Sequence, residues 1–352
     1  MHPRTSRSSA LPFNRPTALL LALAIASTMG CHKSSGGDVG AQDGGPKLAS
    51  SKDAASASAD GAPTSDGAAR VPKGCSADGW CEVMKVRKGN LFGIWGIDSH
   101  DLYAIWGGVL VHEQDLEWHI VPTGGQRIFA VMGTGHKDVW AVGALGCLWH
   151  LTDRWRASKS DNKNDLHGVA ALPSGTVWAV GDGGTILRFD GTEWKSTPSG
   201  TTQNLIGVWA DPSGDAWAVG QNGTALHWVN GAWTAAKTPT QAPIGALWGS
   251  APNDIWAVGG VGTLLHYNGK TWSGGVPATN KDLYGLWGNG STDVWAVGDG
   301  GTILHWDGNL WSSSPSGTED DLHGIWGMES RDMWAVGFSR STGETSTLRR
   351  HR

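Results

Sequence analysis

The stretch that decides the fold is residues 293–311, DVWAVGDGGTILHWDGNLW. Its runs of β-branched and aromatic residues, at 294–297 and 303–306, are bounded by Gly and Asp, which is the pattern of short buried strands. The dipeptide Asp307-Gly308 then precedes Trp311. Asp-Gly accepts the positive φ that a tight hairpin demands. The stretch therefore predicts two antiparallel strands and the start of a third.

The pattern recurs along the chain, and its period can be read from its central aromatic residue. That position is occupied by Tyr103, Trp140, Trp178, Trp217, Trp256, Trp295 and Trp334. The successive spacings are 37, 38 and then 39 residues four times. Each copy begins with an L-x-G-V-W-G pattern, as at residues 283–288 and 322–327. The chain thus contains seven copies of a unit with four strands.

Such a unit cannot cover both apolar faces of its own sheet, so copies must stack. Radial stacking gives a β-propeller, and linear stacking into a solenoid is the alternative. The last copy shows only three strands, whereas Asp78-Gly79-Trp80 resembles the start of a fourth. The prediction is an all-β fold, a seven-bladed β-propeller of four-stranded antiparallel blades whose ring is closed by the N-terminal strand completing the last blade. The counts of 53 Gly and 22 Trp suit many turns and strands.

The chain divides into three parts by composition. Residues 1–30 read as a signal peptide of the lipoprotein type, residues 31–73 as a disordered tether rich in Gly, Ser, Ala and Asp, and residues 74–352 as the propeller. The apolar run at 18–26 is too short for a membrane helix, which needs about 20 residues. A net charge of -5 provides no basic field, so nucleic acid is not an expected partner.

Cysteine positions suggest an exported protein. Residues Thr28-Met29-Gly30-Cys31 resemble the lipobox of bacterial lipoproteins, which implies lipidation of Cys31; ordinary signal cleavage is the alternative. By the same resemblance, His32 after the cysteine implies an outer-membrane lipoprotein facing the periplasm or the cell surface. Cys75 and Cys81 lie six residues apart in a chain bound for an oxidising compartment, so they are candidates for a disulfide.

The repeat also resembles a known group. The sequence W-A-V-G-x-x-G-T-I-L followed by D-G and tryptophan is similar to the repeats of bacterial propellers related to the photosystem II assembly factor and the wider BNR (Asp-box) group. Residues 305–311 lack the serine or threonine and the spacing of the Asp-box itself. The resemblance implies the fold, but not one activity, because the group includes assembly factors and sugar hydrolases.

The hydrolases of that group, the sialidases, use an arginine triad, a tyrosine nucleophile and an acid. Here the three tyrosines, Tyr103, Tyr267 and Tyr284, all occupy strand positions of the repeat. The sequence therefore predicts no enzyme, catalytic residue or cofactor, and glycoside hydrolysis remains a remote alternative.

One ring of polar side chains occupies the third strands. Its members are His112, His150, Arg188, His227, His266, His305 and Arg349. Equivalent residues of a propeller lie one per blade and away from the axis, so they cannot converge on a metal ion. We expect them to bond within their blades to the aspartates before the second strands. Those aspartates are Asp101, Asp138, Asp215, Asp254, Asp293 and Asp332.

Binding specificity is expected where the repeat breaks down, in the connections between blades. These connections should share one rim, with the candidate binding residues Lys159, Asp161, Lys163, Lys237, Thr238, Lys281, Asp282, Glu319 and Asp320. The predicted function is a monomeric, lipid-anchored binding or assembly scaffold for an envelope protein. A carbohydrate-binding, lectin-like propeller is the alternative, because tryptophan rings stack on sugars, and exposed tryptophans would favour it.

Overall fold

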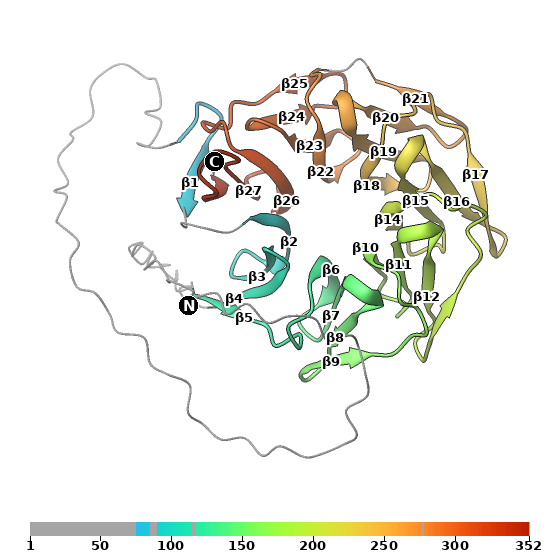
Figure 1. Cartoon of the computed structure of the whole chain (residues 1–352). Coiled ribbons are helices and arrows are strands. Elements are labelled where there is room, and N and C mark those ends of the chain that lie inside the picture. Colours follow the sequence, from blue (N-terminus) through green and yellow to red (C-terminus); the bar gives the residue numbers. More distant parts are fainter. Residues whose placement is uncertain (1–74, 85–89, 115–116, 276–277, 352) are drawn as a thin grey trace, which may run out of the picture.

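The computed structural model describes residues 75–84, 90–114, 117–275 and 278–351, so the predicted signal peptide, Cys31 and the tether lie outside the described residues. The described chain forms seven four-stranded antiparallel sheets arranged in a ring (Figure 1). This confirms the predicted fold class. No helix of the described residues is long and apolar enough to cross a membrane.

The first four blades follow the chain in order. They are β2 (Leu91–Asp98), β3 (Asp101–Trp106), β4 (Val109–Gln114), β5 (Glu117–Ile120); β6 (Ile128–Gly135), β7 (Asp138–Gly143), β8 (Leu148–Leu151), β9 (Trp155–Ser158); β10 (Leu166–Ala171), β11 (Val177–Gly181), β12 (Ile186–Phe189), β13 (Trp194–Ser196); and β14 (Leu205–Ala210), β15 (Ala216–Gly220), β16 (Ala225–Val229), β17 (Ala232–Ala236).

The fifth and sixth blades have the same plan, and the seventh borrows a strand. They are β18 (Ile244–Ala251), β19 (Asp254–Gly259), β20 (Leu264–Tyr267), β21 (Trp272–Gly274); β22 (Leu283–Gly290), β23 (Asp293–Gly298), β24 (Thr302–Trp306), β25 (Trp311–Ser313); and β26 (Asp321–Glu329), β27 (Asp332–Phe338), β28 (Thr345–His351) with β1 (Trp80–Met84). Short 3-10 turns join second to third strands in four blades: η1 (Ala144–Gly146), η2 (Asp182–Gly184), η3 (Gln221–Gly223) and η4 (Gly260–Gly262).

The ring closes through β1, which pairs with β28 in the order β1-β28-β27-β26. The prediction that an N-terminal strand completes the last blade is confirmed. Trp80 is fully buried, and its ring meets that of Trp295 in the sixth blade edge-on at 6.0 Å. The closing strand therefore packs like the fourth strand of any other blade.

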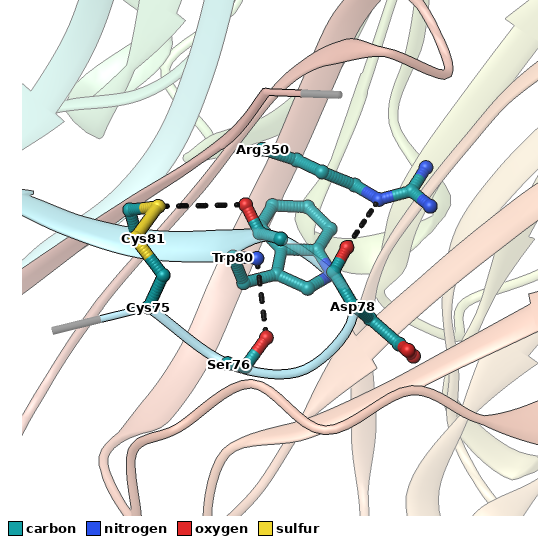
Figure 2. Close-up of a disulfide and its surroundings, with 7 residues drawn as sticks. Cys75, Ser76, Asp78, Trp80, Cys81 and Arg350 are labelled. Carbon is teal, nitrogen blue, oxygen red and sulfur yellow. Dashed lines mark hydrogen bonds between the residues drawn. A yellow bond between two sulfur atoms is a disulfide. The ribbon is translucent and has the colours of Figure 1, made fainter. Parts of the chain in front are cut away.

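A disulfide joins Cys75 to Cys81 just before and within β1 (Figure 2). Inside the loop it closes, the Trp80 N–H donates to Ser76 Oγ at 3.1 Å. Arg350 Nε of β28 donates to the Asp78 carbonyl at 3.1 Å. These bonds tie the start of the closing strand to the last strand of the ring.

The first strands line the axis, because each contacts the first strand of the next blade and β26 contacts β2 (Figure 1). A tryptophan near the end of one first strand lies over a glycine of the next blade. A Cβ added at Gly96 would come within 2.9 Å of the ring of Trp326, and one at Gly288 within 2.7 Å of Trp248. The final glycine of L-x-G-V-W-G thus accommodates the neighbouring blade.

The ring of polar side chains on the third strands is structural in six blades. The partner distances are 2.6 Å for His112–Asp101, 2.8 Å for His150–Asp138, 2.9 Å for His227–Asp215, 2.6 Å for His266–Asp254, 2.9 Å for His305–Asp293 and 2.9 Å for Arg349–Asp332. The expected bonds to aspartates are therefore confirmed in these six. The third blade has Thr176 instead, and Arg188 lies over the Trp178 ring at 5.6 Å.

Candidate functional site

One face of the ring carries both the turns between second and third strands and the connections between blades; we call it the loop face. In five blades, a turn glycine with φ between 65° and 71° packs on the connection that follows. A Cβ at Gly184 would lie 2.0 Å from the Thr201 carbonyl oxygen, and one at Gly301 would lie 1.9 Å from that of Thr318. The equivalents are Gly146, Gly223 and Gly262. Only glycine fits there, so turn and connection form one layer.

The residue before the first strand joins this layer across blades. In four blades its side-chain oxygen accepts the N–H at the tip of the preceding blade's turn. The pairs are Asp165–Leu145 at 2.8 Å, Asn204–Gly183 at 2.9 Å, Asp282–Val261 at 2.7 Å and Asp321–Gly300 at 2.7 Å. An acid or amide at this position therefore has a structural role.

The predicted rim residues all lie in the connections of the loop face. Six are exposed: Lys159, Asp161, Lys163, Lys237, Lys281 and Glu319. The other three, Thr238, Asp282 and Asp320, are half-buried. Thr238 donates its hydroxyl to the Gly223 carbonyl at 2.7 Å, and Asp282 bonds to Val261 as described. Two of the predicted binding residues thus hold the turns in place.

The residues that follow the first Leu or Ile of the first strands form a ring around the axis at the loop face, because this end of the strand pairs with the residue before the turn. The ring consists of Phe92, Phe129, His167, Ile206, Gly245, Tyr284 and His323. Its flanking positions repeat, with Leu or Ile before it and mostly Gly after it. This ring, together with Phe338 and Arg340, is called the axial mouth below.

Four aromatic rings of the axial mouth are stacked across blades six, seven and one. His323 lies parallel to Tyr284 at 4.4 Å and to Phe338 at 4.9 Å between ring centroids. Phe338 meets Phe92 edge-on at 5.4 Å. Phe92 keeps 42% of its surface exposed. The mouth thus presents an apolar wall to solvent on this side.

A longer loop places a charged residue next to this apolar wall. Residues 339–344 join β27 to β28, in place of the short turns of other blades. From this loop Arg340 forms an ion pair with Asp299 at 2.7 Å and another with Asp321. Tyr284 donates its hydroxyl to Asp299 at 2.7 Å. The seventh blade is therefore linked to the sixth by a charged network at the mouth.

Burial governs the ionisation of these mouth residues. It raises the pKa of the Tyr284 phenol, and the hydrogen bond to Asp299 raises it further. Burial also lowers the pKa of His323 below its ordinary value of 6.5, although the carboxylates of Asp321 and Asp299 oppose this. Both rings are therefore held in their neutral forms near neutral pH.

The opposite side of the mouth is built differently. Phe129 stacks on His167 at 5.5 Å, and His167 Nε2 lies 2.8 Å from an Asp182 oxygen. Arg127 lies over the Phe129 ring at 5.4 Å. In the fifth blade the mouth has Gly245, where a Cβ would meet no atom within 4 Å. The mouth is therefore asymmetric, with aromatic walls on two sides and an opening at the fifth blade.

Two turn tips beside the mouth expose large apolar side chains in an unfavourable backbone conformation. Leu145 and Val261 both have φ of 55°, and they are 53% and 72% exposed. Glycine occupies the equivalent sites Gly183 and Gly300. A β-branched residue at positive φ is strained, and its exposure gains no burial to offset the strain. Folding alone does not account for these residues.

Sequence reasoning missed the axial mouth and the Arg340 loop. The seven copies carry both signals: one position that changes from Phe to His, Ile, Gly and Tyr between a Leu or Ile and a Gly or Ala, and extra residues after WAVG in the last copy. The sequence predicted binding at the connections between blades instead, because they differ more between copies.

Neither a metal site nor a catalytic group emerges from the described residues. No cluster of three or more His, Cys, Asp or Glu side chains gathers among them. Burial raises the pKa of Tyr103, which is only 2% exposed, and of Tyr267. Raised pKa values, with that of Tyr284, are the reverse of what a tyrosine nucleophile needs.

None of the tryptophans is largely exposed. All 22 lie within the described residues, and each is buried or half-buried. Their rings pack on one another between blades, as Trp140 does with Trp194 at 5.4 Å. The repeated surface pockets that would favour a lectin are therefore not formed by tryptophan.

These features define the chain as a seven-bladed β-propeller with an asymmetric axial mouth on its loop face. Its fold is similar to that of YCF48 bound to a D1 peptide, with a TM-score of 0.62 and 17% identity over 80% of this chain and 99% of that chain. YCF48 from Cyanidioschyzon merolae is similar at a TM-score of 0.61 and 20% identity, covering 78% and 99%. The WD40 propeller domain of Doa1 is similar at 0.62 and 11%, covering 77% and 97%.

The likeness to YCF48 agrees with the resemblance seen in the repeats, and at these identities it establishes the fold alone. Neither a protein-family model nor a curated protein matches the sequence.

Proposed function

We propose that the protein is a binding or assembly scaffold and not an enzyme, and that a protein partner docks on the loop face at the axial mouth. The observation that carries this proposal is the pair of strained, exposed turn tips, Leu145 and Val261, on the same face as the exposed Phe92. Large apolar groups exposed on one face are typical of protein interfaces. That YCF48 has been solved with a bound D1 peptide supports peptide binding by this kind of fold.

The partner is proposed to be an envelope protein, because the first 31 residues read as a lipoprotein export signal. Lipidation at Cys31 would anchor the protein to the outer membrane, and the tether would separate the propeller from the lipid. The prediction is that Cys31→Ala releases the protein from the membrane fraction of its host. Retention of that variant in the membrane fraction would contradict the anchor but not the docking surface.

Site-specific photocrosslinking tests the docking surface directly. A benzophenone side chain placed at Val261 or Phe92 is expected to crosslink one discrete partner in the host envelope. Matched controls are Leu310 and Met328, which are 50% and 54% exposed on the opposite face, Leu310 in the turn before β25 and Met328 near the end of β26. Equal crosslinking from both faces, or from the opposite face alone, would overturn the proposal.

A further inference from the structure

Arg127 carries a positive charge at a position where three other blades have an aspartate. In the third to seventh blades the residue before the first strand is Asp165, Asn204, Pro243, Asp282 or Asp321. Four of these accept the N–H at the tip of the preceding turn. In the second blade the same position holds a guanidinium, which can only donate. Something other than the bond between turn and connection explains an arginine here.

The first blade explains why the acid is not needed. Its turn is the two-residue hairpin Gly107-Gly108 and has no middle residue to cap. The Gly108 carbonyl instead accepts the Ile128 N–H at 2.8 Å, and the Gly107 N–H donates to the Asn90 carbonyl at 2.8 Å. At this turn the main chain therefore makes the bonds, and the side chain of residue 127 is released from that role.

Arg127 is exposed, and among the described residues no carboxylate pairs with it. Its side chain lies along Gly108, since a Cβ there would come 3.4 Å from Arg127 Cβ, Cγ and Nε. Its guanidinium lies over Phe129. A guanidinium stacked on a ring keeps the N–H donors in its own plane. Arg340 is different, because its guanidinium already forms ion pairs with Asp299 and Asp321.

The segments around Arg127 carry no acid. Residues 121–127, VPTGGQR, contain one cation and no acid, and residues 90–93 and 106–109 contain no charge. Gly107 leaves open space, since a Cβ there would meet nothing within 4 Å. The result is an open site on the loop face, called the Arg127 site, with the Phe129 ring beneath one unpaired guanidinium.

We infer that the Arg127 site binds an acidic side chain of a partner peptide that carries apolar residues beside it; this rests on the proposed function. A guanidinium fork pairs with a carboxylate through two parallel hydrogen bonds, and the apolar neighbours would cover Phe129. A phosphate site would need a cluster of arginines, whereas Asp182, Asp299 and Asp321 occupy the rest of the mouth. A chain-end carboxylate is captured by backbone N–H groups, and the Gly107 N–H is already donated.

The test compares two capped peptides, acetyl-Gly-Leu-Glu-Leu-Gly-amide and its Gln counterpart, with inorganic phosphate as a third probe. Binding to the full chain is followed through the NMR shifts of the Gly107, Gly108 and Ile128 amides. We expect the Glu peptide to bind at least about fivefold more tightly than the Gln peptide. Arg127→Gln should abolish this preference, and Arg127→Lys should retain part of it.

The matched control is Arg154→Gln, which removes an exposed arginine from a turn of the opposite face and should leave the preference unchanged. Equal affinities of the two peptides, a preference that survives Arg127→Gln, or phosphate binding as tight as the Glu peptide would each overturn the inference. If crosslinking from Val261 persisted in those cases, the docking surface would stand and only its acidic specificity would be wrong.

Discussion

At the scale of single residues, His323 shows how the mouth depends on its aromatic packing. Its ring is held between Tyr284 and Phe338, and its buried Nε2 has no hydrogen-bond partner among the described residues. A charged imidazolium would have to form in that environment against the cost of burial. The wall of the mouth is therefore built for a neutral histidine.

The first prediction concerns pH. Because the pKa of His323 is lower in the folded chain than its ordinary 6.5, the unfolded chain binds more protons as the pH falls below that value. The free energy of unfolding should therefore fall from about pH 7 downward until the folded pKa is passed. His323→Phe and His323→Gln should both remove this part of the pH dependence in urea titrations. Unchanged pH profiles in both variants would contradict it.

The second prediction concerns the turn tip Val261. Val261→Gly should raise the free energy of unfolding by about 1 kcal/mol, because glycine adopts positive φ without the Cβ clash. It should also weaken partner crosslinking from Phe92. Val109→Gly, on a regular strand, is the matched control and should lower stability in the same denaturant titration. A loss of stability in Val261→Gly would show that the valine is packed and not strained.

At the scale of the elements, the layer of turns and connections determines the shape of the loop face. Five turns are fixed by glycine contact with the connection that follows, and four of these also by a side-chain oxygen from the next blade. The connections are thereby held, although they lack regular structure. A surface so constrained can present its variable residues in fixed positions, which lowers the entropic cost of binding.

The third prediction tests these bonds between blades. Asp282→Ala removes the acceptor of the Val261 N–H and should lower the free energy of unfolding by about 1 kcal/mol. Asp282→Asn should cost less, because Asn204 makes the equivalent bond to Gly183 in another blade. Thermal and urea unfolding of the two variants provide the comparison. Equal losses would mean that the charge of residue 282, and not its acceptor, matters.

Sequence reasoning succeeded for elements whose determinants are local. The hairpin at Asp307 follows from neighbouring residues, and the His305–Asp293 bond joins two adjacent strands of one repeat. Contacts whose partners come from different copies could not be predicted in this way. Asp282 accepts the N–H of Val261, which lies 21 residues away in another blade. Arg340 and Asp299 are 41 residues apart, and no pattern within one repeat connects them.

At the scale of the whole molecule, the ring depends on β1. The other six blades are each built from one continuous segment, whereas the seventh combines the first and last strands of the described chain. Trp80 fills the place that Trp233 and Trp272 fill in their own blades. Closure therefore uses the same packing as every other interface.

The fourth prediction separates local damage from loss of closure. Trp80→Ala and Trp233→Ala should each cost about 3–5 kcal/mol, as expected for a buried aromatic. Hydrogen exchange should then differ: Trp80→Ala should speed exchange in β28 and β27, whereas Trp233→Ala should do so in β16 and β15. The same exchange pattern from both variants would show that the blades open together and that β1 has no special part.

The pairing of β1 with β28 also determines when the ring can close during synthesis. During synthesis β1 emerges first, and its hydrogen-bonding partner emerges last, after six complete blades have been made. Until then the growing protein is an open arc, with one unpaired strand at its beginning and no finished mouth. The stacked aromatic wall of the axial mouth takes its rings from blades six, seven and one, so it forms only when the ring closes. A partner that recognises this wall would distinguish a finished molecule from a nascent one.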